Sequence, residues 1–206
     1  EKLDLTPQRL AHWREVAEKI VLNTQPDGLI EQFDGFFQLK DAVVADYEPR
    51  TRSMQEIFGV EGANHYQASK QPDVLMVQFL LHDDFNDEQI RVNYNYYTPR
   101  TDHAYGSSLG PSIQAIVACL MGEVEDAYEH FIRAARADLR DVRGNAGDGI
   151  HAASAGGSWQ AVVFGFGGLR VYPDGRWETK PRLPAHWQSL TFRFTLRGEQ
   201  HPVRID

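Results

Sequence analysis

Three polar loops carry the side chains with the clearest capacity for chemistry, and the first leads into a predicted helix. Lys70 and Gln71 stand directly before Pro72. Long polar side chains at such a turn project from a fixed point. A charged donor beside an amide suits sugar hydroxyls, which need both donors and acceptors. For this loop taken alone, a solvated lysine at a helix entry is the simpler alternative.

The second loop, residues 97–111, is rich in small residues just before another predicted helix. Gly106 permits close approach of the backbone to a ligand, and Ser107 and Ser108 offer hydroxyl and N–H donors. The positive end of the helix near Pro111 faces them, which favours an anion by roughly 0.3–1 kcal/mol for each dipole contact. The loop lacks the spacing of a nucleotide-binding P-loop. Plain N-capping by serine is the alternative.

The third loop, residues 149–160, surrounds His151 with small residues, and Gly156 and Gly157 precede a predicted helix. A histidine titrates near neutral pH, so it can carry charge and donate to a phosphate oxygen. The alternative is a structural histidine bonded to a backbone carbonyl.

Other chemical readings are weaker, and we expect neither a metal nor a cofactor. The eight histidines show no close pair at metal-ligand spacing, and Cys119 has no second cysteine. The acidic segment 83–88 lacks the glycine and ligand pattern of a calcium loop. No Gly-x-Ser-x-Gly motif accompanies the serines and histidines, so a nucleophilic serine is not indicated.

Helical patterns position these loops. Thr6 is a predicted N-cap before Pro7, and Asp73 and Asn86 open further helices. The predicted helices cover residues 7–21, 53–58, 73–81, 86–97, 111–122, 123–139 and a segment around 159–164. Residues 29–37 predict a long structured loop. Paired helices with long loops at one end suit an (α/α) barrel, although an ordinary α-domain fits the spacing equally well.

The periodicity changes after residue 170. Residues 190–197 alternate between apolar and polar side chains, as in a half-buried strand, and 203–205 begin another. A lone hairpin is marginally stable in water. We therefore predict one domain over residues 1–172 and the start of a β-domain over 173–206.

Composition excludes several classes of protein. The 206 residues carry a formal net charge of -8, which argues against binding a nucleic-acid backbone. No apolar run approaches eighteen residues, so no membrane span is expected. The single buried-type cysteine and the charged opening segment predict a cytoplasmic protein without a signal peptide.

Five ordered segments, spread over residues 10–197, resemble glycoside hydrolase family 65. They are Gln32–Phe36, Ser69–Val74, Gly106–Leu109 with Ile113–Ile116, Gly149–Ser154 followed by Gly156, Gly157 and Trp159, and Val163–Leu169. Their shared order makes the resemblance far more specific than any single loop.

The resemblance implies a mainly α fold, with residues 1–172 forming the C-terminal half of an (α/α)6-barrel catalytic domain and 173–206 starting a small C-terminal β-sandwich. It implies phosphorolysis of an α-linked glucose disaccharide, with inversion, to β-glucose 1-phosphate and glucose. Lys70 and Gln71 would hold glucose. Ser107, Ser108, His151 and the backbone near Gly156 would hold phosphate, the co-substrate. The full-length enzyme is expected to be a homodimer.

One departure from the family concerns catalysis. The family's general acid is a glutamate in an Asp-Glu-Tyr segment, which these residues lack. We therefore expect the acid upstream, no catalytic residue in this chain, and no activity of the chain alone. Gln114 also stands where many members have histidine.

Two alternatives remain open. An inverting hydrolase of the same family would need a second carboxylate, roughly 6.5–9.5 Å from the acid, to activate water. Loop 97–110 offers only Asp102, which is more simply a turn residue, so we favour phosphorolysis. A non-catalytic carbohydrate-binding helical domain is the other alternative.

Overall fold

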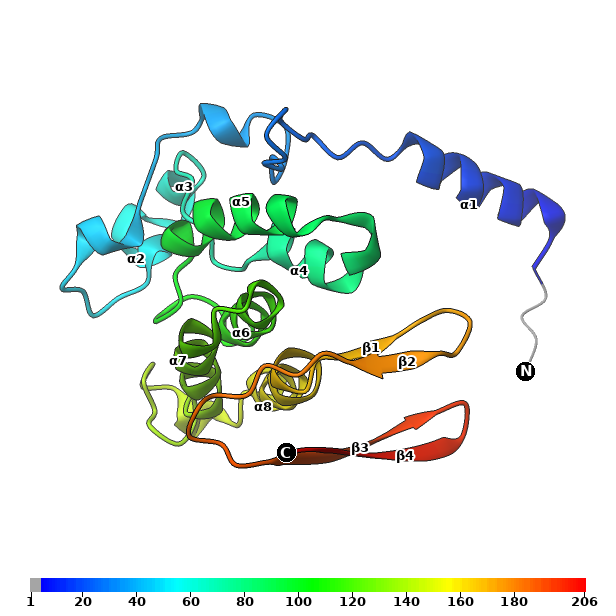
Figure 1. The fold of residues 1–206 in the computed structure, drawn as a ribbon. Coiled ribbons are helices and arrows are strands. Elements are labelled where there is room, and N and C mark those ends of the chain that lie inside the picture. Colours follow the sequence, from blue (N-terminus) through cyan, green and yellow to red (C-terminus); the bar gives the residue numbers. More distant parts are fainter. Residues whose placement is uncertain (1–4) are drawn as a thin grey trace.

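The structure is a computed structural model that describes residues 5–206, and it is mainly helical. Its α-helices are α1 (Pro7–Lys19), α2 (Met54–Phe58), α3 (Val60–Ala63), α4 (Asp73–Leu80), α5 (Asp87–Tyr97), α6 (Gly110–Met121), α7 (Val124–Ala135) and α8 (Ala152–Gln160). Short 3-10 helices occupy Phe36–Gln38, Val44–Tyr47, His82–Asp84, Thr98–Arg100 and Ala146–Asp148, and Ala161–Phe166 is π-helical. Figure 1 shows this arrangement.

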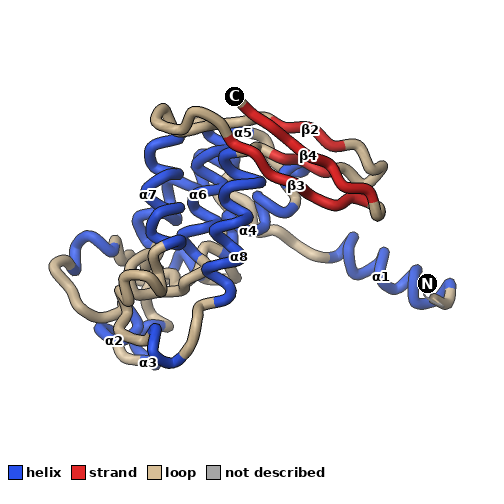
Figure 2. Tube along the Cα trace, turned by 90° about the horizontal axis from the view of Figure 1, so that it is seen from below, coloured by secondary structure: helices blue, strands red, loops and turns tan. Residues whose placement is uncertain are grey.

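Two antiparallel hairpins follow the helices. Strand β1 (Leu169–Val171) pairs with β2 (Trp177–Thr179), and β3 (Leu190–Leu196) pairs with β4 (Glu199–Ile205). The two hairpins lie together at the end of the helices opposite α2 and α3 (Figure 2). The predicted mainly helical chain with late strands is therefore confirmed at this level, while the barrel, the β-sandwich and the boundary at 172 stay predictions.

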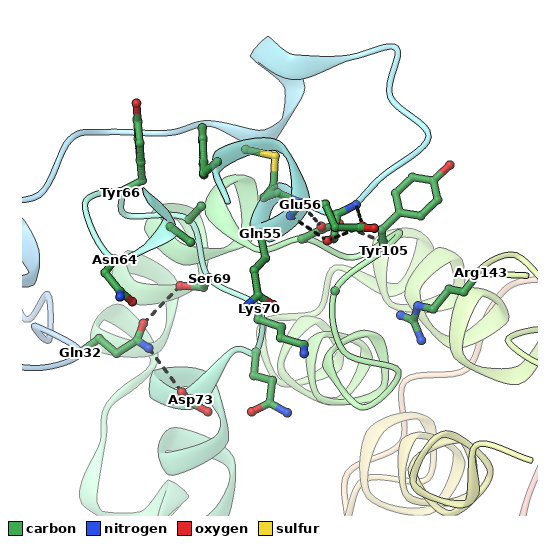
Figure 3. A pocket seen from close by; sticks show the side chains of 18 of the residues that line it. Gln32, Gln55, Glu56, Asn64, Tyr66, Ser69, Lys70, Asp73, Tyr105 and Arg143 are labelled. Carbon is green, nitrogen blue, oxygen red and sulfur yellow. Dashed lines mark hydrogen bonds between the residues drawn. The ribbon is translucent and has the colours of Figure 1, made fainter. Parts of the chain in front are cut away.

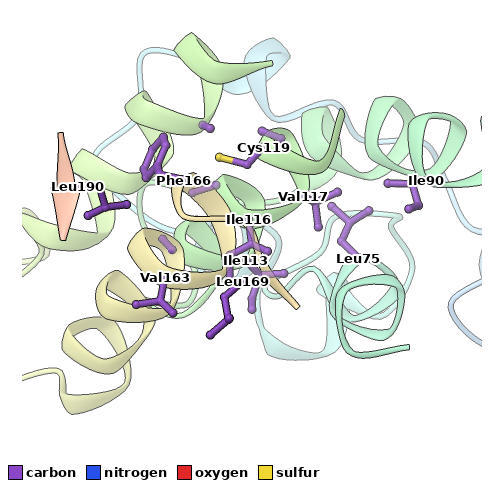
Figure 4. Packing of buried hydrophobic residues seen from close by; sticks show 14 of the residues in the cluster. Leu75, Ile90, Ile113, Ile116, Val117, Cys119, Val163, Phe166, Leu169 and Leu190 are labelled. Carbon is purple, nitrogen blue, oxygen red and sulfur yellow. The ribbon is translucent and has the colours of Figure 1, made fainter. Parts of the chain in front are cut away.

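Helix α6 is the centre of the fold. Every residue from Gly110 to Cys119 is buried, because α6 touches α4, α5, α7, α8 and the π-helical segment. A helix that is apolar on all sides is expected to be enclosed in this way. The surrounding cluster, drawn in Figure 4, includes Leu75, Ile90, Phe166 and Leu190.

The glycines of the third loop lie inside a helix, where the sequence predicted them to precede one. Helix α8 begins at Ala152 and includes Gly156 and Gly157. A Cβ atom at Gly157 would lie 2.3 Å from the hydroxyl oxygen of Ser112 on α6. The glycine is needed for this close helix crossing, which the sequence pattern does not reveal.

Other helix boundaries differ by a few residues. Thr6 caps α1 as predicted, since its hydroxyl accepts a hydrogen bond from the N–H of Arg9. The helix ends at Lys19, because Ile20 is already extended. Helix α7 ends at Ala135, four residues before the predicted end at Leu139.

Helix α1 extends away from the rest of the molecule (Figure 1). It contains no buried residue, and Trp13 on its apolar face is 47% exposed. The second hairpin behaves differently, because Leu190, Phe192 and Val203 belong to the helical core cluster. Among residues 5–206, none of the helices is long and apolar enough to cross a membrane.

Candidate functional site

A cavity of about 1110 Å³ opens at the end of the molecule formed by α2, α3 and the long loops (Figure 3). It is lined by residues from the segments 32–39, 51–73, 102–106 and 141–145. The labelled side chains include Lys70, Asp73, Glu56 and Arg143. Most of the lining is polar, so the cavity suits a hydrophilic ligand.

The first two polar loops are joined by a short parallel bridge. Ser69 pairs with Thr101, its N–H donating to the carbonyl of Arg100 over 2.7 Å. One step further, the N–H of Ser107 donates to the carbonyl of Lys70 over 3.2 Å. The side-chain amide of Gln71 donates to the hydroxyl oxygen of Ser107 over 3.2 Å. Residues assigned to glucose and to phosphate are thus in contact.

Gly106 is required for this junction. A Cβ atom there would lie 2.2 Å from the carbonyl oxygen of Asp102 and 3.0 Å from that of Lys70. The sequence predicted close approach of a ligand at Gly106. The structure shows close approach of the chain's own backbone, although Gly106 also lines the cavity.

Asp102 anchors the second loop through a buried ion pair with Arg50. Arg50 donates two hydrogen bonds to the carboxylate, over 2.7 and 3.0 Å, and the N–H groups of Met54 and Tyr105 add two more at 2.9 Å. Burial alone would raise the pKa of Asp102, but the bonds from Arg50 and these N–H groups outweigh it and hold the pKa below its usual value. Asp102 therefore acts as a structural carboxylate.

Ser107 and Ser108 lie beside the cavity rather than on its lining. The hydroxyl of Ser107 accepts a hydrogen bond from the N–H of Leu109, and no side chain caps α6. Neither serine therefore acts as the N-cap of α6, which was the alternative considered from the sequence. Gln114, on the next turns of α6, is buried and accepts a hydrogen bond from Thr98 over 3.1 Å.

His151 is held at the start of α8 by Asp138. Its backbone N–H donates to one carboxylate oxygen over 2.8 Å, and its Nδ1 bonds to the other. This bond from His151 lowers the pKa of Asp138. A histidine fixed through Nδ1 has only Nε2 left for a ligand. The partner of His151 is therefore a carboxylate, whereas the alternative considered from the sequence was a backbone carbonyl.

Gly156 and His151 are not on the lining of the cavity. Gly156 is the fifth residue of α8, so its N–H falls within the helical hydrogen-bond ladder. A Cβ atom at Gly156 would meet nothing within 4 Å. The helix surface beside Gly156 is open, whereas the surface beside Gly157 is closed.

Several residues on the cavity were not among the candidates for binding or catalysis that the sequence offered. Two carboxylates illustrate this. Burial raises the pKa of Asp73, which accepts a hydrogen bond from Gln32 over 3.3 Å. Glu56 is occupied by the capping box of α2, because it accepts from both the N–H and the hydroxyl of Ser53. The arginine of the opposite wall, Arg143, was also missed.

No metal site emerges in the part of the chain that the structure describes. No group of three or more histidine, cysteine, aspartate or glutamate side chains within residues 5–206 is placed to hold a metal ion. The chemistry that the cavity itself offers comes from ammonium, guanidinium, amide, hydroxyl and carboxylate groups.

Comparison with known proteins places this helical frame and polar cavity in a class of carbohydrate-active enzymes. The sequence profile described as "Glycosyl hydrolase family 65 central catalytic domain" matches residues 1–160. The chain therefore belongs to glycoside hydrolase family 65, as its motifs predicted.

Its relatives are phosphorylases. The chain is 42% identical over 206 residues to the kojibiose phosphorylase of Caldanaerobacter subterraneus subsp. tengcongensis, covering 99% of this chain and 26% of that protein. It is 37% identical over 205 residues to the alpha,alpha-trehalose phosphorylase of Thermoanaerobacter brockii, covering 99% and 26%. The chain thus spans about a quarter of the length of these curated relatives.

A solved structure shows the same fold. A putative kojibiose phosphorylase from the human microbiome superposes with a TM-score of 0.85 at 34% identity, covering 98% of this chain and 28% of that one. The fold of this chain is thus already seen in a solved structure.

Proposed function

We propose that this chain forms part of an inverting disaccharide phosphorylase, which cleaves an α-linked glucose disaccharide with phosphate to β-glucose 1-phosphate and glucose. The observation that carries the proposal is the contact between Gln71 and Ser107. Phosphorolysis requires the sugar and the phosphate side by side, and this contact joins the loops assigned to each. The named activities of the relatives support the same class of reaction.

In this proposal Lys70 and Gln71 bind the reacting glucose. Ser107, Ser108, His151 and the open helix surface at Gly156 bind phosphate. Phosphate is itself the nucleophile, so the site needs no second carboxylate to activate water. The carboxylates of Asp102 and Glu56 fit this reading, since both are occupied by donors from their own chain.

The proton for the leaving group is proposed to come from a glutamate outside these 206 residues. The barrel, the C-terminal β-sandwich and the homodimer belong to the same proposal. The isolated chain should then show no phosphorolysis, while the complete protein that contains it should be active.

The test is a product analysis of the complete protein with kojibiose, trehalose, nigerose and maltose. With phosphate, we expect glucose 1-phosphate, and proton NMR of the first product should show the β anomer. Cleavage at the same rate without phosphate would contradict the proposal in favour of a hydrolase. Sugar binding without cleavage in either buffer would favour a carbohydrate-binding domain.

A further inference from the structure

The wall of the cavity opposite Lys70 is a loop held rigidly at several points. Residues 141–145 line the cavity. The carboxylate of Asp141 accepts a hydrogen bond from the N–H of Ala146 over 2.8 Å, and its carbonyl accepts from the N–H of Gly144 over 2.9 Å. At the loop's end, Asp138 binds His151. The side chain carried by this loop therefore has a defined position.

Arg143 reaches from this wall into the cavity. Figure 3 shows its guanidinium and the ammonium of Lys70 extending toward each other from opposite sides. Asp102 and Asp138 both attract the guanidinium. Asp102 belongs to the second polar loop, and Asp138 holds His151 of the third, so Arg143 lies between the two groups of residues assigned to phosphate.

The guanidinium of Arg143 lacks the partners that other arginines of this fold have. Its Nε atom is buried and has no hydrogen-bond partner within residues 5–206. By contrast, Arg50 and Arg100 each bind a carboxylate with two nitrogens. Burial lowers the pKa of Arg143, but an arginine side chain stays protonated in proteins. A partly buried, unpaired positive charge is costly unless a ligand satisfies it.

The nearby carboxylates are already engaged. Asp102 accepts from Arg50, Met54 and Tyr105, and Asp138 accepts from the N–H and imidazole of His151. Neither forms an ion pair with Arg143 among the contacts between described residues. The missing partner is therefore an acceptor that enters the cavity from solution.

We propose that Arg143 is a further binding residue of this site and contacts the phosphate co-substrate directly. The planar guanidinium matches two phosphate oxygens at once, which makes it a stronger partner for this anion than an ammonium group. A sugar hydroxyl would supply an acceptor but would leave the charge uncompensated. This inference rests on the proposed phosphorolysis.

The test measures initial rates of phosphorolysis by the complete protein, varying phosphate and disaccharide separately. Arg143→Gln should raise the phosphate KM by about ten- to a hundredfold, the loss expected for one charge-assisted contact. The disaccharide KM should change less than about twofold. The phosphate KM of Arg143→Lys should lie between those of the wild type and Arg143→Gln, because lysine keeps the charge but cannot bind two phosphate oxygens with a planar guanidinium. The exposed neighbour Arg140 gives a matched control, and Arg140→Gln should behave as the wild type.

Two results would overturn the inference while leaving the proposed function intact. One is an unchanged phosphate KM in Arg143→Gln, and the other is a rise confined to the disaccharide KM. If the heat-unfolding midpoint shows that Arg143→Gln does not fold, Arg143→Lys serves as the test in its place. A phosphate KM of Arg143→Lys equal to the wild-type value would then contradict a forked contact. A wild-type protein that forms no glucose 1-phosphate would instead refute the proposed function itself.

Discussion

Nη2 of Arg50 lies 2.7 Å from Oδ1 of Asp102, and both side chains are almost completely buried, with 4% and 3% exposed. Fifty-two positions separate the two residues in the chain. Asp102 also starts the turn that brings Gly106 against the carbonyl of Lys70. The shape of the cavity therefore depends on a buried ion pair within the chain itself.

Breaking this pair should destabilise the protein strongly. Asp102→Asn would leave the guanidinium of Arg50 buried with its charge uncompensated, which typically costs about 3–5 kcal/mol. The free energy of unfolding, measured with urea on the complete protein, should fall by that order. Asp174→Asn is the matched control, because the Asp174–Arg176 pair is exposed and water screens such a pair, so it contributes little to stability. Equal effects of the two substitutions would contradict the structural role.

His130, which is buried, and His103, which is half-buried, should make the fold sensitive to acid. The rings of His103 and His130 lie with centroids 4.7 Å apart, and the Nδ1 atom of each is buried without a hydrogen-bond partner in residues 5–206. Burial, helped by the neighbouring His130 and by Arg133, lowers the pKa of His103 to about 3. Burial and Arg133 lower that of His130 to about 4.

The direction of the pH effect follows from these lowered values. An unfolded histidine takes up a proton near pH 6.5, while the folded pair stays neutral until pH 3–4. Stability is therefore fully present above about pH 6.5 and is lost as the pH falls toward 4. Urea unfolding at several pH values measures this loss. The free energy of unfolding should fall less steeply with decreasing pH in the double variant His103→Gln/His130→Gln than in the wild type. The exposed His12 provides a control, and His12→Gln leaving the same slope as the double variant would refute this account.

Neighbouring glycines of α8 should respond oppositely to alanine. Gly157→Ala would place a methyl group 2.3 Å from the hydroxyl and 2.8 Å from Cβ of Ser112, and overpacking of this kind typically costs about 1–3 kcal/mol. Gly156→Ala meets nothing within 4 Å, and alanine favours a helix by up to about 1 kcal/mol.

The two glycine variants are compared by their heat-unfolding midpoints and their phosphate kinetics. Gly156→Ala should keep or raise the heat-unfolding midpoint and weaken phosphate binding, if phosphate approaches the open helix surface. Gly157→Ala should lower the midpoint. A Gly156→Ala protein with wild-type phosphate kinetics would remove Gly156 from the phosphate site without affecting the packing argument.

The apolar face of α1 should drive self-association of the isolated 206-residue chain. Leu10, Trp13 and Val16 are 37%, 47% and 43% exposed, and contiguous exposed apolar surface favours aggregation or partner binding. Light scattering after size exclusion should show oligomers that Trp13→Glu with Val16→Glu reduces. A monomer that melts cooperatively would contradict this prediction.

The sequence predicted the structure best where a residue type has a single local role, such as capping a helix end. Thr6 before Pro7, Asn86 before α5 and Gly122 after α6 mark helix ends through capping, and those ends are where the sequence predicted them. The glycines of α8 were misplaced because their purpose is a contact with α6, forty-five positions away for Gly157 and Ser112. Helix crossings of this kind leave no periodic signal.

The candidate site shows the same contrast between local motifs, which the sequence reveals, and long-range contacts, which it does not. Motif order singled out Lys70, Gln71, Ser107 and His151 as candidates, and the structure joins three of them through the contacts of Ser107. The ion pair of Arg50 depends on the fold and cannot be read from spacing. Arg143 lies in a polar loop where an arginine has no predictable partner, so its position inside the cavity becomes visible only in three dimensions.

The claim that this chain carries the phosphate side of a phosphorylase is tested most directly at His151. Asp138 fixes its Nδ1, which leaves Nε2 as the candidate phosphate ligand. In the complete protein, His151→Ala should raise the phosphate KM, or lower kcat, by about one to two orders of magnitude, with little change in the disaccharide KM. Lys70→Ala should show the reverse preference. If His151→Ala leaves phosphate kinetics intact and weakens the disaccharide instead, the assignment of this loop to phosphate is wrong.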